Sequence, residues 1–218
     1  MILVSGCSYV EKQDWPTYLF GKNVIQAGHG GACNWIISES VLKKINCDTD
    51  FVYVQFSGVN RMSIPVTTEF AKTISQKLVK IRTGRKTWIV SGGFHASWMN
   101  YKHHSSHYYK IFKNYYSGLP KNLLKMHTEY SLYHVIHCLN FLEKKNIKYC
   151  FGWMYDFFKS DITTGQGIMD KTNSLYNEVP WHKFINIFPF DTAQKHNELL
   201  SDKVHPTSKG YEIWCDLV

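Results

Sequence analysis

The sequence predicts an α/β protein, a three-layer α/β/α sandwich with helices on both faces of a parallel sheet of five strands. Short runs of branched and aromatic residues alternate along the chain with longer segments whose apolar residues recur every three or four positions. Strands that alternate with helices in this way form parallel sheets with right-handed crossovers. The composition, with 44% hydrophobic and 19% charged residues, is that of a globular chain.

Five segments have the composition of strands. The first is the apolar run at residues 2–5, and residues 23–26 form the second. Residues 50–56 are the clearest strand, because they are apolar on both faces like a central strand of a parallel sheet. Residues 86–91 and 147–153 are the fourth and fifth.

The predicted helices show apolar residues at helical spacing between these strands. The first also has Pro16 in its opening turn, where proline is well tolerated. The predicted helices are residues 15–20, 34–45, 67–81, 122–145 and 208–217.

The chain of 218 residues is long enough to bury an α/β core without disulfides or metals. We predict a single domain, residues 1–218, because no internal repeat or low-complexity linker divides it. Residues 94–120, rich in His, Tyr and Lys, follow the fourth strand and are a candidate lid or cleft wall. A metal site at His103, His104 and His107 is one interpretation of this segment. A hydrated polar helix is the other, and it fits better because no carboxylate ligand lies nearby.

The six cysteines lack C-x-x-C spacing, so neither a zinc site nor a disulfide framework is indicated, and no metal or cofactor is expected. The formal net charge of +8 favours encounter with anionic partners such as acidic polysaccharide, nucleic acid or anionic lipid. The lysines are spread along the chain, so solvated helix faces are the simpler explanation of this charge.

No stretch approaches the ~20 apolar residues of a membrane-spanning helix. The first residues also lack the basic start and long apolar core of a signal peptide. We therefore expect a cytoplasmic protein whose partner is a small-molecule or glycan ester, with an anionic polymer as a second candidate. The sequence indicates no oligomeric state.

A candidate nucleophile follows the first strand. Gly6-Cys7-Ser8 comes directly after the run at residues 2–5, where the strand stops and the chain turns sharply. Ser8 would stand at the carboxyl edge of the sheet, where ligands bind in open α/β folds, with backbone N–H groups near an incoming oxyanion. Cys7 is a less suitable nucleophile, because its side chain is expected to point away from the cleft.

A candidate general base lies near the end of the sequence. Asp202 and His205 stand three residues apart, directly before Pro206 and the last predicted helix. This spacing lets the carboxylate reach the Nδ1–H of the imidazole while Nε2 faces outward, as in two members of a serine triad. An ordinary loop aspartate that caps the helix, with a surface histidine beside it, is the alternative interpretation.

Two further loops follow predicted strands and contain glycine. Residues 27–32 follow the second strand, and residues 57–60 follow the third. The first loop offers a backbone N–H group and the second a side-chain amide. These are two kinds of donor found in oxyanion holes.

The four blocks, in this order along the chain, resemble the SGNH/GDSL hydrolase family. The resemblance spans the chain from Ser8 to His205 and implies a flavodoxin-like sheet with strand order 2-1-3-4-5. It implies that Ser8 is the nucleophile, His205 its general base and Asp202 the partner that orients the imidazole. The implied oxyanion hole consists of the N–H groups of Ser8 and Gly31 and the side-chain amide of Asn60.

Two positions depart from the pattern of that family. Cys7 stands where an aspartate usually precedes the serine, and Arg61 stands where an aspartate usually follows the asparagine. Neither is one of the four residues that name the family, so the chemistry can persist. The support of the loops and the preferred substrate are what these replacements affect.

We expect a serine hydrolase that cleaves an ester through an acyl-enzyme. An O-acetyl ester on a carbohydrate is favoured, because the predicted cleft walls are aromatic and polar and no long apolar loop would bury a fatty chain. Arg61, His95 and Trp181 are candidate substrate-binding residues. A lipase or thioesterase of the same family is one alternative, and a non-catalytic module that binds glycan or nucleic acid is the other.

Overall fold

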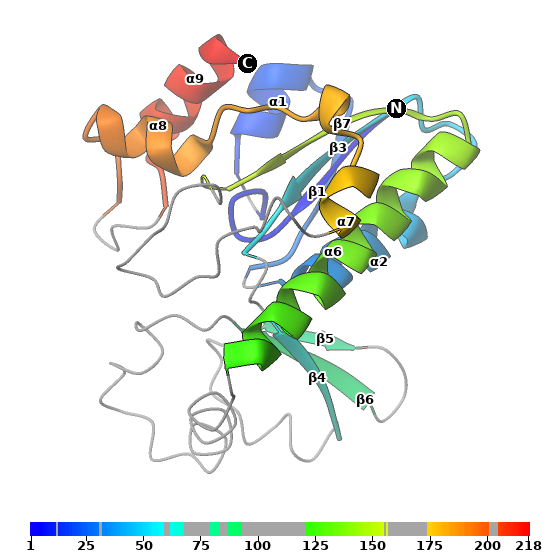
Figure 1. The fold of residues 1–218 in the computed structure, drawn as a ribbon. Coiled ribbons are helices and arrows are strands. Elements are labelled where there is room, and N and C mark those ends of the chain that lie inside the picture. The colour runs from blue at the N-terminus through cyan, green and yellow to red at the C-terminus, as the bar shows by residue number, and fades with distance from the viewer. Residues whose placement is uncertain are drawn as a thin grey trace.

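A computed structural model of the chain describes residues 1–11, 13–30, 32–58, 62–67, 79–82, 87–92, 121–154, 156, 174–200 and 205–218. The described residues form an α/β structure built around a four-stranded parallel sheet (Figure 1). The predicted α/β class and parallel sheet are therefore confirmed.

The parallel sheet has the strand order β2-β1-β3-β7. Its strands are β1 (Ile2–Gly6), β2 (Val24–Gly28), β3 (Phe51–Phe56) and β7 (Lys148–Trp153). In the register of the sheet, Gly6 lies beside Gly28 on one side and Gln55 on the other. The carboxyl ends of β1, β2 and β3 are therefore level, and the loops that follow them leave the sheet at one edge.

The fourth predicted strand does not join this sheet. Residues 86–91 correspond to β6 (Thr87–Gly92), which lies between β4 (Met62–Thr67) and β5 (Val79–Arg82) in a separate antiparallel sheet. Only residues 83–86 join β5 to β6, which is too short for the crossover that parallel strands need. The prediction of five parallel strands is therefore not confirmed, and β7 takes the place beside β3.

The helix predicted for residues 67–81 is wrong at both ends. Thr67 ends β4, and residues 79–81 lie in β5, while residues 68–78 lie outside the described part of the chain. Val79-Lys80-Ile81-Arg82 alternates apolar and basic residues. This period of two is typical of a strand with one exposed face. At residues 79–81 it predicts the observed strand, whereas the helical spacing does not.

The other predicted helices are confirmed within one residue. The helices are α1 (Trp15–Phe20), α2 (Asn34–Lys44), α6 (Lys121–Lys144) and α9 (Ser208–Leu217). The segment after β7 adds the shorter α7 (Ser174–Glu178), a single 3₁₀ turn η1 (Trp181–Lys183), and α8 (Pro189–Lys195). Within the described ranges, no helix is both long and apolar enough to cross a membrane.

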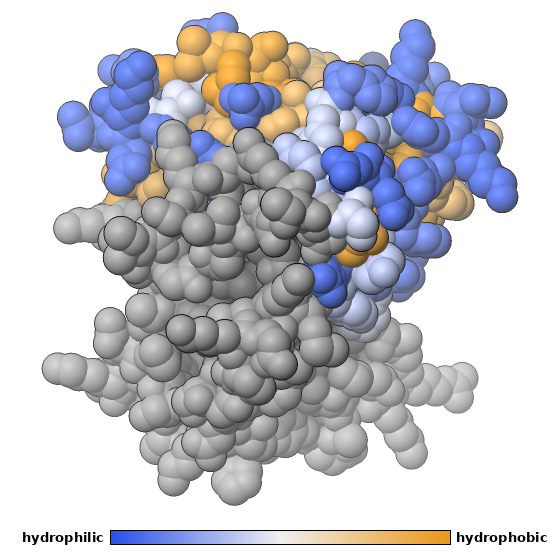
Figure 2. Space-filling model, in the orientation of Figure 1, coloured by the Kyte–Doolittle hydropathy of each residue, from blue (hydrophilic) through white to orange (hydrophobic). Residues whose placement is uncertain are grey.

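The helices cover both faces of the parallel sheet (Figure 1). On one face the ring of Tyr53 packs against Trp15 of α1 and Trp214 of α9. On the other face Ser5 Oγ donates a hydrogen bond to the carbonyl of Ile37 in α2. Leu3, Val52 and other strand residues between these layers are fully buried. Figure 2 shows hydrophilic side chains spread over both flanks of the described surface and an apolar area along its upper edge.

Gly28 allows the turn after β1 to pack directly on the end of β2. A Cβ atom at this position would stand 2.7 Å from the carbonyl carbon of Val10 and 2.8 Å from Glu11 Cα. Both are backbone atoms, so the neighbour cannot move aside by changing a rotamer. The close approach of the two segments therefore depends on glycine.

We predict that Gly28→Ala lowers the free energy of unfolding by about 1–3 kcal/mol, the usual cost of overpacking. Urea denaturation followed by circular dichroism measures this loss. Gln26→Ala, at an exposed position of the same strand, is the control and should change stability much less. Equal stability of Gly28→Ala and the wild type would contradict the packing described above.

Candidate active site

Ser8 lies in a tight turn directly after β1. The N–H groups of Val10 and Glu11 both donate to the carbonyl of Cys7, at 2.9 and 3.1 Å. The Cys7 side chain is fully buried, with Sγ 3.6 Å from Met154 Sδ. The Cys7 thiol therefore points into the core, whereas Ser8 is half-buried.

His205 is held at the start of α9 by hydrogen bonds on both sides of it. Its carbonyl accepts from the N–H of Leu200 at 2.8 Å, and the N–H of Thr207 donates to the carbonyl of Glu198 at 2.7 Å. Thr207 caps the helix, because its Oγ1 accepts from the N–H of Gly210 at 3.0 Å and donates to the Glu198 carboxylate at 2.7 Å. The backbone that carries the imidazole is therefore fixed by the α8–α9 connection.

The two side chains meet, although 197 residues separate them in the sequence. His205 Nε2 lies 2.7 Å from Ser8 Oγ. The ring of Tyr9, which is almost fully buried, packs against the imidazole with its centroid at 5.3 Å. A hydroxyl within hydrogen-bonding distance of an imidazole nitrogen is the geometry of a nucleophile and its general base.

The glycine loop after β2 lies next to this pair. The N–H of His29 donates to the carbonyl of Gly6 at 3.0 Å, which continues the pairing of β1 and β2. The N–H of Gly30 donates to Glu11 Oε2 at 2.7 Å. A Cβ atom on Gly30 would stand 3.8 Å from Ser8 Cβ, so the loop runs along the turn that carries the serine.

A buried polar network joins the loop after β3 to the glycine loop. The N–H of Ser57 donates to Asn34 Oδ1 at 2.8 Å, and Asn34 Nδ2 donates to the carbonyl of Ser57 and to Ser131 Oγ, at 3.2 and 2.8 Å. Ser57 Oγ donates to the carbonyl of Ala32 at 2.7 Å. Asn34 and Ser57 are both buried. The network therefore holds the end of the glycine loop and the start of the loop after β3 in a fixed relation.

Glu11 and Asn34 also contact the site loops, and neither is among the site residues predicted from the sequence. Glu11 lies three residues after Ser8, on the same turn, and this spacing is the signal that could have linked it to the site. Asn34 opens α2 directly after the glycine loop. A polar residue at the start of a helix is usually explained by helix capping. Only the fold shows that the Asn34 side chain forms hydrogen bonds with Ser57.

Several predicted site residues lie outside the described part of the chain. They are Gly31, Asn60, Arg61, His95 and Asp202, together with the candidate lid at residues 94–120, which includes His103, His104 and His107. Their roles stay predictions. Among the residues the structure does describe, no group of three or more His, Cys, Asp or Glu side chains is arranged to hold a metal ion.

Trp181 packs in an aromatic cluster beside β7. Its ring stacks on Trp153 with centroids 5.7 Å apart and lies 4.6 Å from the ring of Tyr176. Its Nε1 donates to the carbonyl of Tyr176 at 2.7 Å. These packing contacts account for the position of the Trp181 side chain. A contact between Trp181 and substrate stays a prediction.

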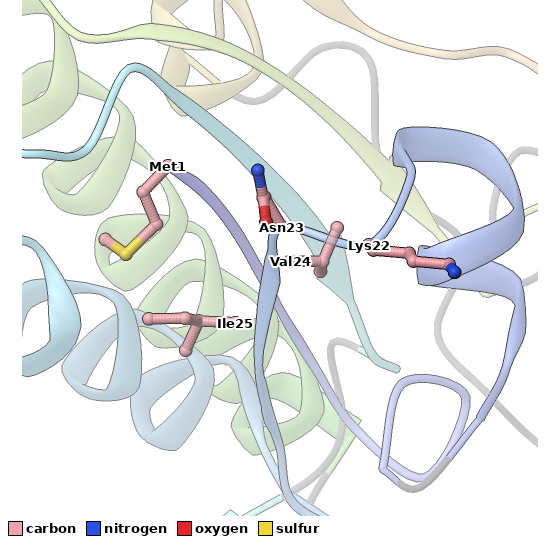
Figure 3. A pocket seen from close by; sticks show the side chains of 5 residues that line it. All are labelled: Met1, Lys22, Asn23, Val24 and Ile25. Atoms are coloured by element: carbon pink, nitrogen blue, oxygen red, sulfur yellow. The ribbon is translucent and has the colours of Figure 1, made fainter.

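A pocket on another part of the surface lies away from this pair. It is lined by Met1, Lys22, Asn23, Val24 and Ile25 (Figure 3). These residues stand at the amino ends of β1 and β2, whereas Ser8 follows the carboxyl end of β1. The pocket is therefore at the opposite edge of the sheet from the candidate site.

Comparison of the chain with protein-family models and with curated proteins finds no match. The fold and the site define the chain as an α/β protein with a Ser–His pair at the carboxyl edge of its parallel sheet.

We predict that Asn34→Ala lowers the free energy of unfolding by about 1–3 kcal/mol, because it leaves the buried N–H of Ser57 without its acceptor. Urea denaturation measures the change. Ser40→Ala in the same helix is the control, because the Ser40 hydroxyl bonds only to a carbonyl one turn earlier. Equal effects of the two variants would show that the network does not stabilise the loops.

His29 gives the protein a pH-dependent stability. Burial lowers the pKa of His29 below its usual 6.5, which Glu11 partly offsets and Lys44 reinforces. A group whose pKa falls on folding stabilises the fold above the unfolded pKa, and that stability is lost as the pH falls through the folded pKa. The wild type should therefore lose more stability than His29→Gln between pH 7 and pH 5. Parallel pH dependences in urea denaturation would contradict this.

Proposed function

We propose that the chain is a serine hydrolase that cleaves esters, with Ser8 as the nucleophile and His205 as its general base. The observation that carries the proposal is the distance of 2.7 Å between Ser8 Oγ and His205 Nε2. The pair lies at the carboxyl edge of a parallel sheet, where α/β proteins bind their ligands. A surface histidine beside a capping aspartate, the alternative interpretation of the motif, would not require this contact.

The reaction proceeds by acyl transfer to water. His205 Nε2 takes the proton of Ser8 as Oγ attacks the carbonyl carbon of the ester, and the carbonyl oxygen becomes an oxyanion. His205 then returns the proton to the departing alcohol, which leaves an acyl-enzyme on Ser8. A water molecule, deprotonated by His205, attacks the acyl carbon; the bond from this carbon to Ser8 Oγ then breaks, His205 returns the proton to Oγ, and the acid is released. These steps use no metal ion or organic cofactor.

The oxyanion is assigned three donors. The N–H of Ser8 lies at the start of its turn and has no acceptor within that turn. The N–H of Gly31 and the side-chain amide of Asn60 complete the set in this proposal. The described neighbours support it, because Gly30 lies next to Ser8 and the Ser57 network holds the loop that leads to Asn60. Loss of one such donor typically reduces the rate by about 10²–10³.

Asp202 is assigned to orient the imidazole. It lies three residues before His205, in a segment whose flanking residues Leu200 and His205 are joined by a backbone hydrogen bond. Its carboxylate would accept the Nδ1–H of His205 and stabilise the imidazolium that forms during attack.

We further propose that the chain has the SGNH/GDSL hydrolase fold. The support is the order of the described pieces in the sheet. Ser8 follows β1, the glycine loop follows β2, Ser57 follows β3, and His205 precedes the last helix. Strands in the order β2-β1-β3 are those that the resemblance implies for this half of the sheet.

The favoured substrate is an O-acetyl ester on a carbohydrate. Polar side chains lie near Ser8, because Gln13 donates to the carbonyl of Ser8, Glu11 bonds to the adjoining glycine loop and His205 lies against the hydroxyl. Polar neighbours of this kind suit a small acyl group on a polar alcohol. A screen of acetylated sugars, short- and long-chain esters and acyl thioesters separates this substrate class from those of a lipase or thioesterase.

We predict that Ser8→Ala abolishes hydrolysis of p-nitrophenyl acetate and labelling by a fluorophosphonate probe, because both require the serine oxygen. Circular dichroism should show that the variant remains folded. Cys7→Ala is the matched control: its thiol points into the core, so this variant should keep both activities. Hydrolysis that persists without Ser8 and is lost without Cys7 would assign the chemistry to the thiol.

A wild-type protein that hydrolyses no ester of the screen and takes up no fluorophosphonate would contradict the proposal. Retention of such a protein on nucleic acid, with a steep dependence on salt, would favour the polyanion-binding alternative.

A further inference from the structure

The carboxylate of Glu11 connects the turn of the nucleophile to the glycine loop. Glu11 belongs to the turn that carries Ser8, because its own N–H donates to the carbonyl of Cys7 at 3.1 Å. Its side chain reaches across to the N–H of Gly30, which donates to Oε2 at 2.7 Å.

The contact depends on the absence of a side chain at residue 30. A Cβ atom there would stand 2.5 Å from Glu11 Oε2 and 3.8 Å from Ser8 Cβ. The carboxylate and the serine therefore both lie close to one point on the loop. The glycine loop is therefore held against Ser8 by the hydrogen bond between Gly30 and Glu11, which lies three residues after Ser8.

We propose that Glu11 is a positioning residue, which sets the distance between the oxyanion-binding glycine loop and Ser8. This inference rests on the proposed function, because it assigns a role in ester hydrolysis. The amide of Gly30 is occupied by the carboxylate, so the oxyanion donor of this loop in the proposed function is the N–H of Gly31 and not that of Gly30. An error of about 1 Å in the place of such a donor costs on the order of 10²-fold in rate.

The role requires a hydrogen-bond acceptor at residue 11 and not a negative charge. Glu11→Gln keeps an oxygen that can accept from the N–H of Gly30, whereas Glu11→Ala removes it. A purely structural role would lower the melting temperature and leave the rate per folded molecule unchanged.

The test compares the rate of fluorophosphonate labelling, kcat and KM for p-nitrophenyl acetate, and the melting temperature across variants. Glu11→Ala should reduce kcat and the labelling rate about 10- to 100-fold with little change in KM. Glu11→Gln should stay within about threefold of the wild type. Glu39→Ala, which removes a partly exposed carboxylate of α2 that pairs with Lys43, is the control for net charge and should match the wild type.

Gly30→Ala keeps the proposal testable if Glu11→Ala does not fold. Its methyl group would displace the carboxylate, so it should reproduce the loss seen in Glu11→Ala. The double variant should be no worse than either single one, since both break the same bond.

The outcomes separate the two proposals. A wild-type protein that is not labelled would contradict the proposed function itself. A labelled wild type with an equally reactive Glu11→Ala, or a Glu11→Gln as impaired as Glu11→Ala, would overturn the positioning role alone.

Discussion

The register of the parallel sheet is the constraint on which the candidate site depends. Gly6, Gly28 and Gln55 lie side by side across β1, β2 and β3, so the three loops that follow start at the same level. The hydrogen bond from the N–H of His29 to the carbonyl of Gly6 extends this pairing by one residue. A slip of one residue between β1 and β2 would turn the side chains of the shifted strand to the other face. It would also separate the serine turn from the glycine loop.

The position of the His205 imidazole is set by the α8–α9 connection and not by the parallel sheet. His205 is attached to the α8–α9 connection, where Gly210 packs so closely on the carbonyl of Glu198 that a Cβ would stand 2.8 Å from that oxygen. Tyr9 connects the turn that carries Ser8 to the α8–α9 connection, because it follows Ser8 in the chain and its ring packs against both His205 and Tyr211 of α9. The distance between the hydroxyl and the imidazole is thus set by packing between α9 and the turn after β1.

The features that could be predicted from the sequence are those encoded by local patterns. Residues 51–56 form a strand because they are apolar on both faces, and α9 begins and ends where its spacing predicts. Which strands pair is decided by contacts between distant parts of the chain, so the sequence led to a wrong position for β6 in the parallel sheet. The four residues between β5 and β6 could have indicated an antiparallel pair. The contact between Ser8 and His205 was expected from motifs in the sequence, whereas the contacts of Glu11 and Asn34 form only once the fold brings them to Gly30 and Ser57.

Cys7, which stands where the proposed SGNH/GDSL family usually has an aspartate, is consistent with this distribution of polar contacts. The Cys7 side chain is fully buried with its sulfur against that of Met154, which is a poor hydrogen-bond partner for a carboxylate. An ionised aspartate there would lose its hydration without gaining an equivalent partner, and that is costly in a protein interior. The loops beside Ser8 are instead held from other positions, the glycine loop by Glu11 and the loop after β3 by Asn34. In this chain, the two loops beside Ser8 are therefore held by residues further along the sequence than position 7.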